Sequence, residues 1–185
     1  MLKEILEDAE RRMEAAIENC RRELAALRAG RASPALLEKI RVDYYGTQVP
    51  VNQVATVTVP EPRLIVIQPW DRNVLAEIER AIVKSDLGLT PANDGKVIRL
   101  TVPPLTEERR QELVKQARRL AEEGRVAIRN IRRDANDTIR ELEKEGEASE
   151  DEARRALDDV QKLTDRCIAR IDEMVEARER EILEV

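Results

Sequence analysis

The chain has 185 residues and a formal net charge of -5, with 38% charged and only 2% aromatic residues. Its core must therefore be built from aliphatic side chains, a composition typical of long amphipathic helices. The chain has no histidine, which excludes histidine-based catalytic triads and histidine-containing zinc sites. Two cysteines are too few for a disulfide framework, and no apolar run reaches the roughly 18 residues of a membrane span. These features predict a soluble, cytoplasmic protein with no membrane contact.

The first predicted element is a helix from Leu2 to Ala29. Gly30 suits a C-terminal cap, and Pro34 cannot continue the helix. Apolar residues recur at every third or fourth position, as on one face of a helix: Leu2, Ile5, Leu6, Ala9, Met13, Ile17, Cys20, Leu24 and Leu27.

The middle of the chain follows a different pattern. Residues 39–46, 54–60, 63–70 and 96–104 predict strands, because β-branched residues alternate or run together in them. Residues 71–86 return to helical spacing, with Asp71 as the N-cap. Residues 87–95 predict a loop. The pattern indicates a small α/β unit.

Two long helices are predicted after this unit. The first begins after Thr106 and continues to about Lys144, and a capping box of Ser149 and Glu152 opens the second. No helix can bury its apolar face alone, so the Leu2–Ala29 helix should complete an antiparallel three-helix bundle with these two. Cys20 and Cys167 each lie about 18 residues from the start of their helices, which predicts buried thiols at similar heights.

The predicted fold class is therefore α+β. A long antiparallel three-helix bundle, residues 1–30 and 105–185, carries an inserted small α/β domain, residues 31–104, in an L-shaped molecule. The chain crosses twice between the two domains, at 30–34 and 103–105, in segments that contain Gly and Pro. These crossings predict a hinge formed by Arg31, Ala32, Ser33, Pro34, Pro103, Pro104 and Leu105.

The penultimate helix concentrates arginine on one side. Within an arc of about 100° on a wheel of 3.6 residues per turn lie Arg118, Arg125, Arg129, Arg132, Arg133 and Arg140. Glu122 and Glu143 interrupt this arc, and other acids gather elsewhere on the helix. A solvated face and an anion-binding face both fit this pattern. Arginine favours phosphate groups or a carboxylate-rich partner, and the scarcity of aromatic residues argues against base stacking.

The sequence does not predict an enzyme. Neither G-x-x-x-x-G-K-[ST] nor G-x-G-x-x-G occurs, so the common phosphate-binding loops are missing. The many carboxylates are typical of solvated helix faces, and a hydrolase would need a deep pocket in which several converge. A helical adaptor that binds another protein through the bundle is the alternative.

Five stretches together resemble the bacterial ribosome recycling factor family over the whole chain. They are GRASPALLEKIRVDYYG, SDLGL, PPLTEERR, VAIRNIRRDAND and DDVQKLTD, in this order. The resemblance implies a cytoplasmic monomer without cofactor, metal or catalytic residues. Such a protein binds the post-termination ribosome and, with elongation factor G and GTP, splits it into subunits. It also implies contacts with RNA of the large ribosomal subunit, first through Arg132, and further through Arg28, Gly30, Arg31, Arg110, Arg125, Arg129 and Arg133.

Overall fold

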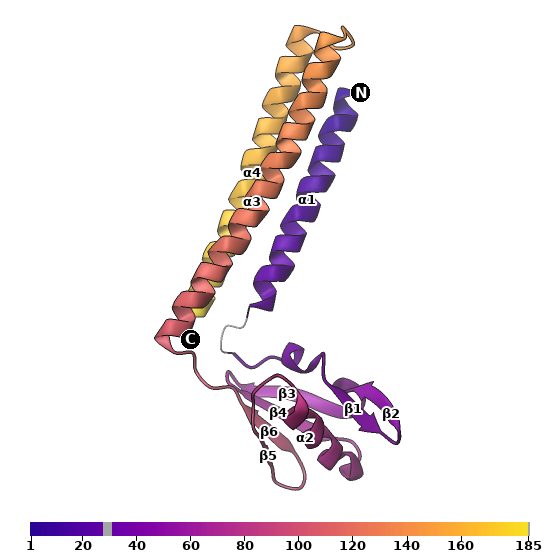
Figure 1. The fold of residues 1–185 in the computed structure, drawn as a ribbon, viewed down its shortest axis with the longest axis vertical. Coiled ribbons are helices and arrows are strands. Elements are labelled where there is room, and N and C mark those ends of the chain that lie inside the picture. The colour runs from indigo at the N-terminus through magenta and orange to yellow at the C-terminus, as the bar shows by residue number, and fades with distance from the viewer. Residues whose placement is uncertain (28–30, 185) are drawn as a thin grey trace. The chain divides into compact units, whose positions relative to one another are not determined.

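The computed structural model describes residues 1–27 and 31–184. The chain divides into two units, one made of three long helices and the other of short strands and one short helix (Figure 1). The α+β class predicted from the sequence is confirmed. No helix in the described part of the chain is long and apolar enough to cross a membrane.

The helical unit contains α1 (Leu2–Ala26), α3 (Glu107–Lys144) and α4 (Glu150–Leu183). Helices α1 and α4 run in the same direction, and α3 runs against both (Figure 1). The predicted apolar faces are buried between them. The largest fully buried side chains of this unit are Met13, Ile17, Leu113, Ile128, Ile139 and Ile171.

The helix ends predicted from the sequence are confirmed only in part. Helix α1 ends at Ala26, before the predicted Ala29, because Leu27 is extended with ψ 127°. An Nη2 hydrogen of Arg178 on α4 is donated to the Leu27 carbonyl, which satisfies one of the acceptors left over at a helix end. The predicted cap at Gly30 lies outside the described residues. The predicted capping box of α4 is confirmed, with Glu152 N donating to Ser149 Oγ at 3.1 Å.

The small unit is built on two antiparallel sheets. A hairpin joins β1 (Arg41–Tyr44) to β2 (Thr47–Pro50), and the larger sheet has the order β3-β4-β6-β5. Its strands are β3 (Ala55–Glu61), β4 (Leu64–Pro69), β5 (Pro91–Asn93) and β6 (Ile98–Thr101), and α2 covers residues Leu75–Lys84. An aliphatic core joins helix and sheets, and its fully buried members include Val42, Val51, Ile65, Ile67, Ile78, Ile82, Ile98 and Leu100.

Two local predictions in this unit are corrected. Residues 87–95 are not all loop, because Pro91–Asn93 form β5, which pairs with Ile98–Leu100 of β6. A three-residue edge strand that starts with proline forms only because it pairs with its neighbour. It is too short to show an alternation of apolar and polar residues. Helix α2 begins at Leu75, later than predicted, because the Asp71 carboxylate accepts from Asn73 N at 2.9 Å and caps a 3-10 turn (Arg72–Val74) first.

Both cysteines are free and 2% exposed, as predicted. A Cβ at Gly124 of α3 would lie 3.0 Å from Ile171 Cδ1 and 3.3 Å from Cys20 Sγ, so three helices meet closely at this glycine. Cys20 is therefore level with Ile171, about one turn along α4 from Cys167. Burial raises the pKa of both thiols.

Two of the predicted hinge residues, Ala32 and Ser33, form hydrogen bonds within the small unit. Ala32 N donates to the Pro62 carbonyl at 2.7 Å. Ser33 Oγ accepts from Ala35 N at 3.2 Å and caps a 3-10 turn that starts at Pro34. On the second crossing, Pro103 and Pro104 are exposed and Leu105 is half-buried. The hinge at Arg31–Pro34 and Pro103–Leu105 stays a prediction.

Candidate nucleic-acid interface

Two ion pairs join the arginine side of α3 to α4. Arg118 Nε lies 2.7 Å from Glu179 Oε1, and Arg125 Nη2 lies 2.7 Å from Asp172 Oδ1. The two arginines are seven residues apart along α3, and their partners are seven residues apart in the opposite direction along α4. The arginine arc therefore borders the α3–α4 contact, which these pairs help to fix.

Glu122 binds two arginines of the same arc. Its carboxylate accepts from Arg129 Nη1 at 2.9 Å and from Arg125 Nη1 at 3.2 Å. These hydrogen bonds, that from Arg129 foremost, hold the pKa of Glu122 below its usual range. Glu122 is therefore ionised near neutral pH and offsets part of the positive charge of the arc.

The separation of charge along α3 is thus less complete in three dimensions than on a helical wheel. Arg118, Arg125 and Arg129 each have a carboxylate partner. A wheel of one helix could not show this, because two of the carboxylates come from α4, which is distant in sequence.

The rest of the arc lies further toward the C-terminal end of α3. Within the described residues, Arg132, Arg133 and Arg140 form no ion pair, and Arg133 Nη1 donates to Asn130 Oδ1 at a long 3.4 Å. Arg133 and Arg140 are exposed, and Arg132 is half-buried. Guanidinium groups without a carboxylate partner can bind a phosphate through two parallel hydrogen bonds. Arg132 and Arg133 therefore form the centre of a candidate anion-binding face.

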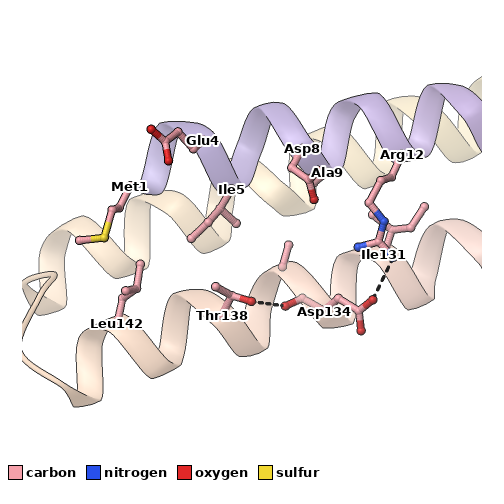
Figure 2. A pocket seen from close by; sticks show the side chains of 11 residues that line it. Met1, Glu4, Ile5, Asp8, Ala9, Arg12, Ile131, Asp134, Thr138 and Leu142 are labelled. Carbon is pink, nitrogen blue, oxygen red and sulfur yellow. Dashed lines mark hydrogen bonds and ion pairs between the residues drawn. The ribbon is translucent and has the colours of Figure 1, made fainter.

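The opposite side of α3 is acidic and faces α1. Arg12 Nη2 lies 3.1 Å from Asp134 Oδ2, and Thr138 Oγ1 donates to the Asp134 carbonyl at 3.0 Å (Figure 2). A groove of about 340 Å³ runs between the two helices over an apolar floor that includes Ile5 and Ile131. Its acids do not converge, since Asp134 binds Arg12 and Asp8 binds Arg11. No group of three or more His, Cys, Asp or Glu among the described residues could hold a metal ion.

The remaining predicted RNA-binding residues lie elsewhere. Arg28 and Gly30 fall outside the described residues. Arg31 is exposed, and Arg110 is half-buried, with an Nε that has no hydrogen-bond partner within the described residues. Arg110 is on the first turn of α3, roughly 33 Å along the helix from Arg132 at 1.5 Å per residue. The structure therefore does not bring Arg110 into the same site as Arg132.

Sequence reasoning missed one feature of the small unit. Tyr44, Tyr45 and Trp70 are all exposed, although the chain has no other aromatic residue. The signal was present in DYYG, where two aromatic residues stand beside a turn glycine.

The model of the family described as "Ribosome recycling factor" matches residues 20–183. The chain belongs to the ribosome recycling factor family. It is 63% identical to the ribosome-recycling factor of Carboxydothermus hydrogenoformans and 60% identical to that of Halalkalibacterium halodurans. Each comparison extends over 185 residues and covers 100% of both chains.

Solved structures of family members share the fold. One is a solution structure of the ribosome recycling factor, with a TM-score of 0.76 and 50% identity over 100% of this chain and 98% of that chain. Another is described as models for the T. thermophilus ribosome recycling factor and the E. coli elongation factor G bound to the E. coli post-termination complex. It has a TM-score of 0.63 and 52% identity over 99% of both chains.

Proposed function

We propose that the protein recycles ribosomes: it binds the post-termination ribosome and, with elongation factor G and GTP, separates the subunits. Membership of the ribosome recycling factor family over the full length supports this function. The family member placed with elongation factor G on a post-termination complex supports the same partners for this chain.

RNA binding by the helical unit is inferred from Arg132 and Arg133. They lie on a side of α3 where Arg118 and Arg125 are already paired with α4. Arg132 and Arg133 have no carboxylate partner within the described residues and can bind phosphates of ribosomal RNA in the large subunit. A net charge of -5 is compatible with this, because the local field decides where RNA binds.

The protein acts by binding the ribosome and by the motion of its small unit, and it catalyses no reaction itself. The chain has no histidine and no phosphate-binding loop, so GTP hydrolysis belongs to elongation factor G. The small unit moves relative to the helical unit about the crossings at Arg31–Pro34 and Pro103–Leu105. The protein works in the cytoplasm as a monomer.

An adaptor function would require a continuous apolar face on the helical unit. Large exposed apolar side chains are scattered there, with Met1 before α1, Val126 on α3 and Leu183 on α4. This distribution favours ribosome recycling over a helical adaptor.

Co-sedimentation with large ribosomal subunits at several salt concentrations tests the binding step. We expect affinity to fall steeply with salt, as for a protein held by phosphate contacts. A splitting assay with elongation factor G and GTP tests the reaction. Binding that is insensitive to salt, or absence of splitting with all components present, would contradict the proposal.

A further inference from the structure

All aromatic side chains of the protein lie on the surface of the small unit. Tyr44, Tyr45 and Trp70 are 38%, 72% and 66% exposed, and the chain has one Trp, two Tyr and no Phe. Aliphatic residues alone fill the core of this unit. Tyr and Trp are the side chains most enriched at the energetic centres of protein interfaces. Exposure of all three in one region therefore indicates an interaction surface.

Trp70 and Tyr45 are held in position by hydrogen bonds from their polar ends, and Tyr44 by contact with the ring of Tyr45. Trp70 Nε1 donates to Thr56 Oγ1 at 2.8 Å. The Tyr45 hydroxyl donates to Asp71 Oδ2 at 2.6 Å. Tyr44 and Tyr45 meet edge to face, with ring centroids 4.7 Å apart. Rings fixed before a partner arrives lose little conformational freedom on binding.

Tyr45 occupies a backbone position that does not suit tyrosine. The two-residue turn between β1 and β2 consists of Tyr45 and Gly46, with φ of 49° and 87°. Such a turn favours Asn-Gly or Asp-Gly, because both residues adopt positive φ. Folding alone would prefer asparagine at position 45. The turn itself therefore does not explain the tyrosine.

The surroundings of the rings are apolar and acidic. A hollow of about 180 Å³ is lined by the residues Tyr44, Val49, Gln53, Val54, Trp70 and Asp71. Asp71 is the one charged residue among the described residues that line it. The hydrogen bond from the Tyr45 hydroxyl holds the pKa of Asp71 below its usual range, so the carboxylate stays ionised. Ring faces beside a carboxylate attract organic cations and repel the phosphates of RNA.

We infer that Tyr44, Tyr45, Trp70 and Asp71 form a docking surface for a loop of a protein partner that carries arginine or lysine. The aliphatic stem of the basic side chain would enter the hollow, and its charge would meet Asp71 and the face of an aromatic ring. This inference does not depend on the recycling function, because it concerns the small unit of the isolated protein and none of the arginines of α3.

Trp70 provides a direct readout, since it is the only tryptophan of the chain. The full-length protein, with its single indole N–H signal observed by NMR, is titrated with a peptide of alternating glycine and arginine. We expect a saturable shift of the indole signal. The same peptide with citrulline in place of arginine, and an oligouridylate, should leave the signal unchanged at equal ionic strength. No saturable shift with the arginine peptide, or an equal response to either control ligand, would overturn the inference.

Tyr45→Asn separates binding from folding. Asparagine suits the turn but removes the hydrogen bond to Asp71. These two effects on stability oppose each other, so the urea midpoint should change little, while the Kd for the arginine peptide should increase by about threefold, the effect of one exposed cation–π contact. Val83→Ala is the matched control, since Val83 is 65% exposed on α2 in the same unit. It should leave the Kd unchanged. A Tyr45→Asn protein with unaltered affinity would show that the ring binds nothing.

Discussion

Arg125 on α3 contacts Asp172 on α4 at 2.7 Å. Arg118 and Glu179, seven residues away on each helix, form the equivalent pair, also at 2.7 Å. Continued by seven residues in the other direction, this register places Arg132 opposite Asp165. Asp165 instead accepts a hydrogen bond from Gln161 at 2.9 Å, and no ion pair with Arg132 forms within the described residues. The repeat of pairs stops at the arginine that the proposed function needs for RNA.

This arrangement predicts different roles for two arginines of one helix. Arg125→Ala removes a half-buried side chain with two carboxylate partners, and we expect it to lower the free energy of unfolding by about 1 kcal/mol. Arg132 is also half-buried but has no carboxylate partner within the described residues, so Arg132→Ala should lower the free energy of unfolding by less than Arg125→Ala. Urea denaturation of both variants measures the difference. Equal losses would show that Arg132 also holds the bundle together.

Under the proposed function, Glu122 should weaken RNA binding, because its carboxylate forms an ion pair with Arg129. An exposed ion pair of this kind contributes only about 0–1 kcal/mol, so a phosphate can compete for the guanidinium. Glu122→Gln should therefore bind large subunits more tightly, with a steeper dependence on salt. Glu143→Gln, on the same arc without an ion pair in the described part of the chain, is the matched control. Weaker binding of the Glu122 variant would contradict this role.

Asp94 should make the stability of the small unit depend on pH. Its carboxylate accepts from Val97 N at 2.9 Å, from Arg99 Nη1 at 2.8 Å and from Lys96 N at 2.9 Å. These bonds hold the pKa of Asp94 well below its usual range. Their stabilising effect is complete above the unfolded pKa of about 4 and is lost as the pH falls toward the lower folded value.

Asp94→Asn should therefore lower the urea midpoint at pH 7, and the difference from the unaltered chain should shrink below about pH 4. Denaturation curves at a series of pH values measure this. A difference that stayed constant down to pH 2 would rule out the carboxylate as its source.

Burial of the two cysteines predicts a slow reaction with thiol reagents. Cys20 and Cys167 are each 2% exposed, and burial raises the pKa of both thiols, so little thiolate is available to react. Labelling with a thiol reagent should be slow in the native protein and fast in urea. Rapid native labelling of both cysteines would contradict the packing of α1, α3 and α4 around Gly124.

The long-range periodicity of the sequence predicted the helices well, because each helix has one apolar face repeated over many turns. Ser149 and Glu152 correctly predicted the start of α4, because a capping box involves only residues that are close in sequence. Strand β5 was missed because Pro91–Asn93 become a strand only through pairing with β6. Short strands that depend on a partner carry no periodicity of their own.

The candidate site was predictable only in part for a similar reason. A wheel places Arg118, Arg125 and Arg132 together, yet it cannot show that Glu179 and Asp172 neutralise the first two. Pairing across helices depends on the register of α3 against α4. The exposure of Tyr45 and Trp70 also depends on tertiary packing, and composition indicated only that aromatic residues are scarce.

The proposed function requires Arg132 to bind a phosphate of ribosomal RNA. The most direct measurement is co-sedimentation of Arg132→Ala with large subunits over a series of salt concentrations, with Arg22→Ala, an exposed position of α1, as the control. We expect weaker binding for Arg132→Ala and a salt dependence shallower by about one unit in log–log slope. Arg132→Lys should recover only part of the binding, because lysine lacks the planar fork. A folded Arg132→Ala protein with the affinity and slope of the unaltered chain would contradict the proposed role of Arg132.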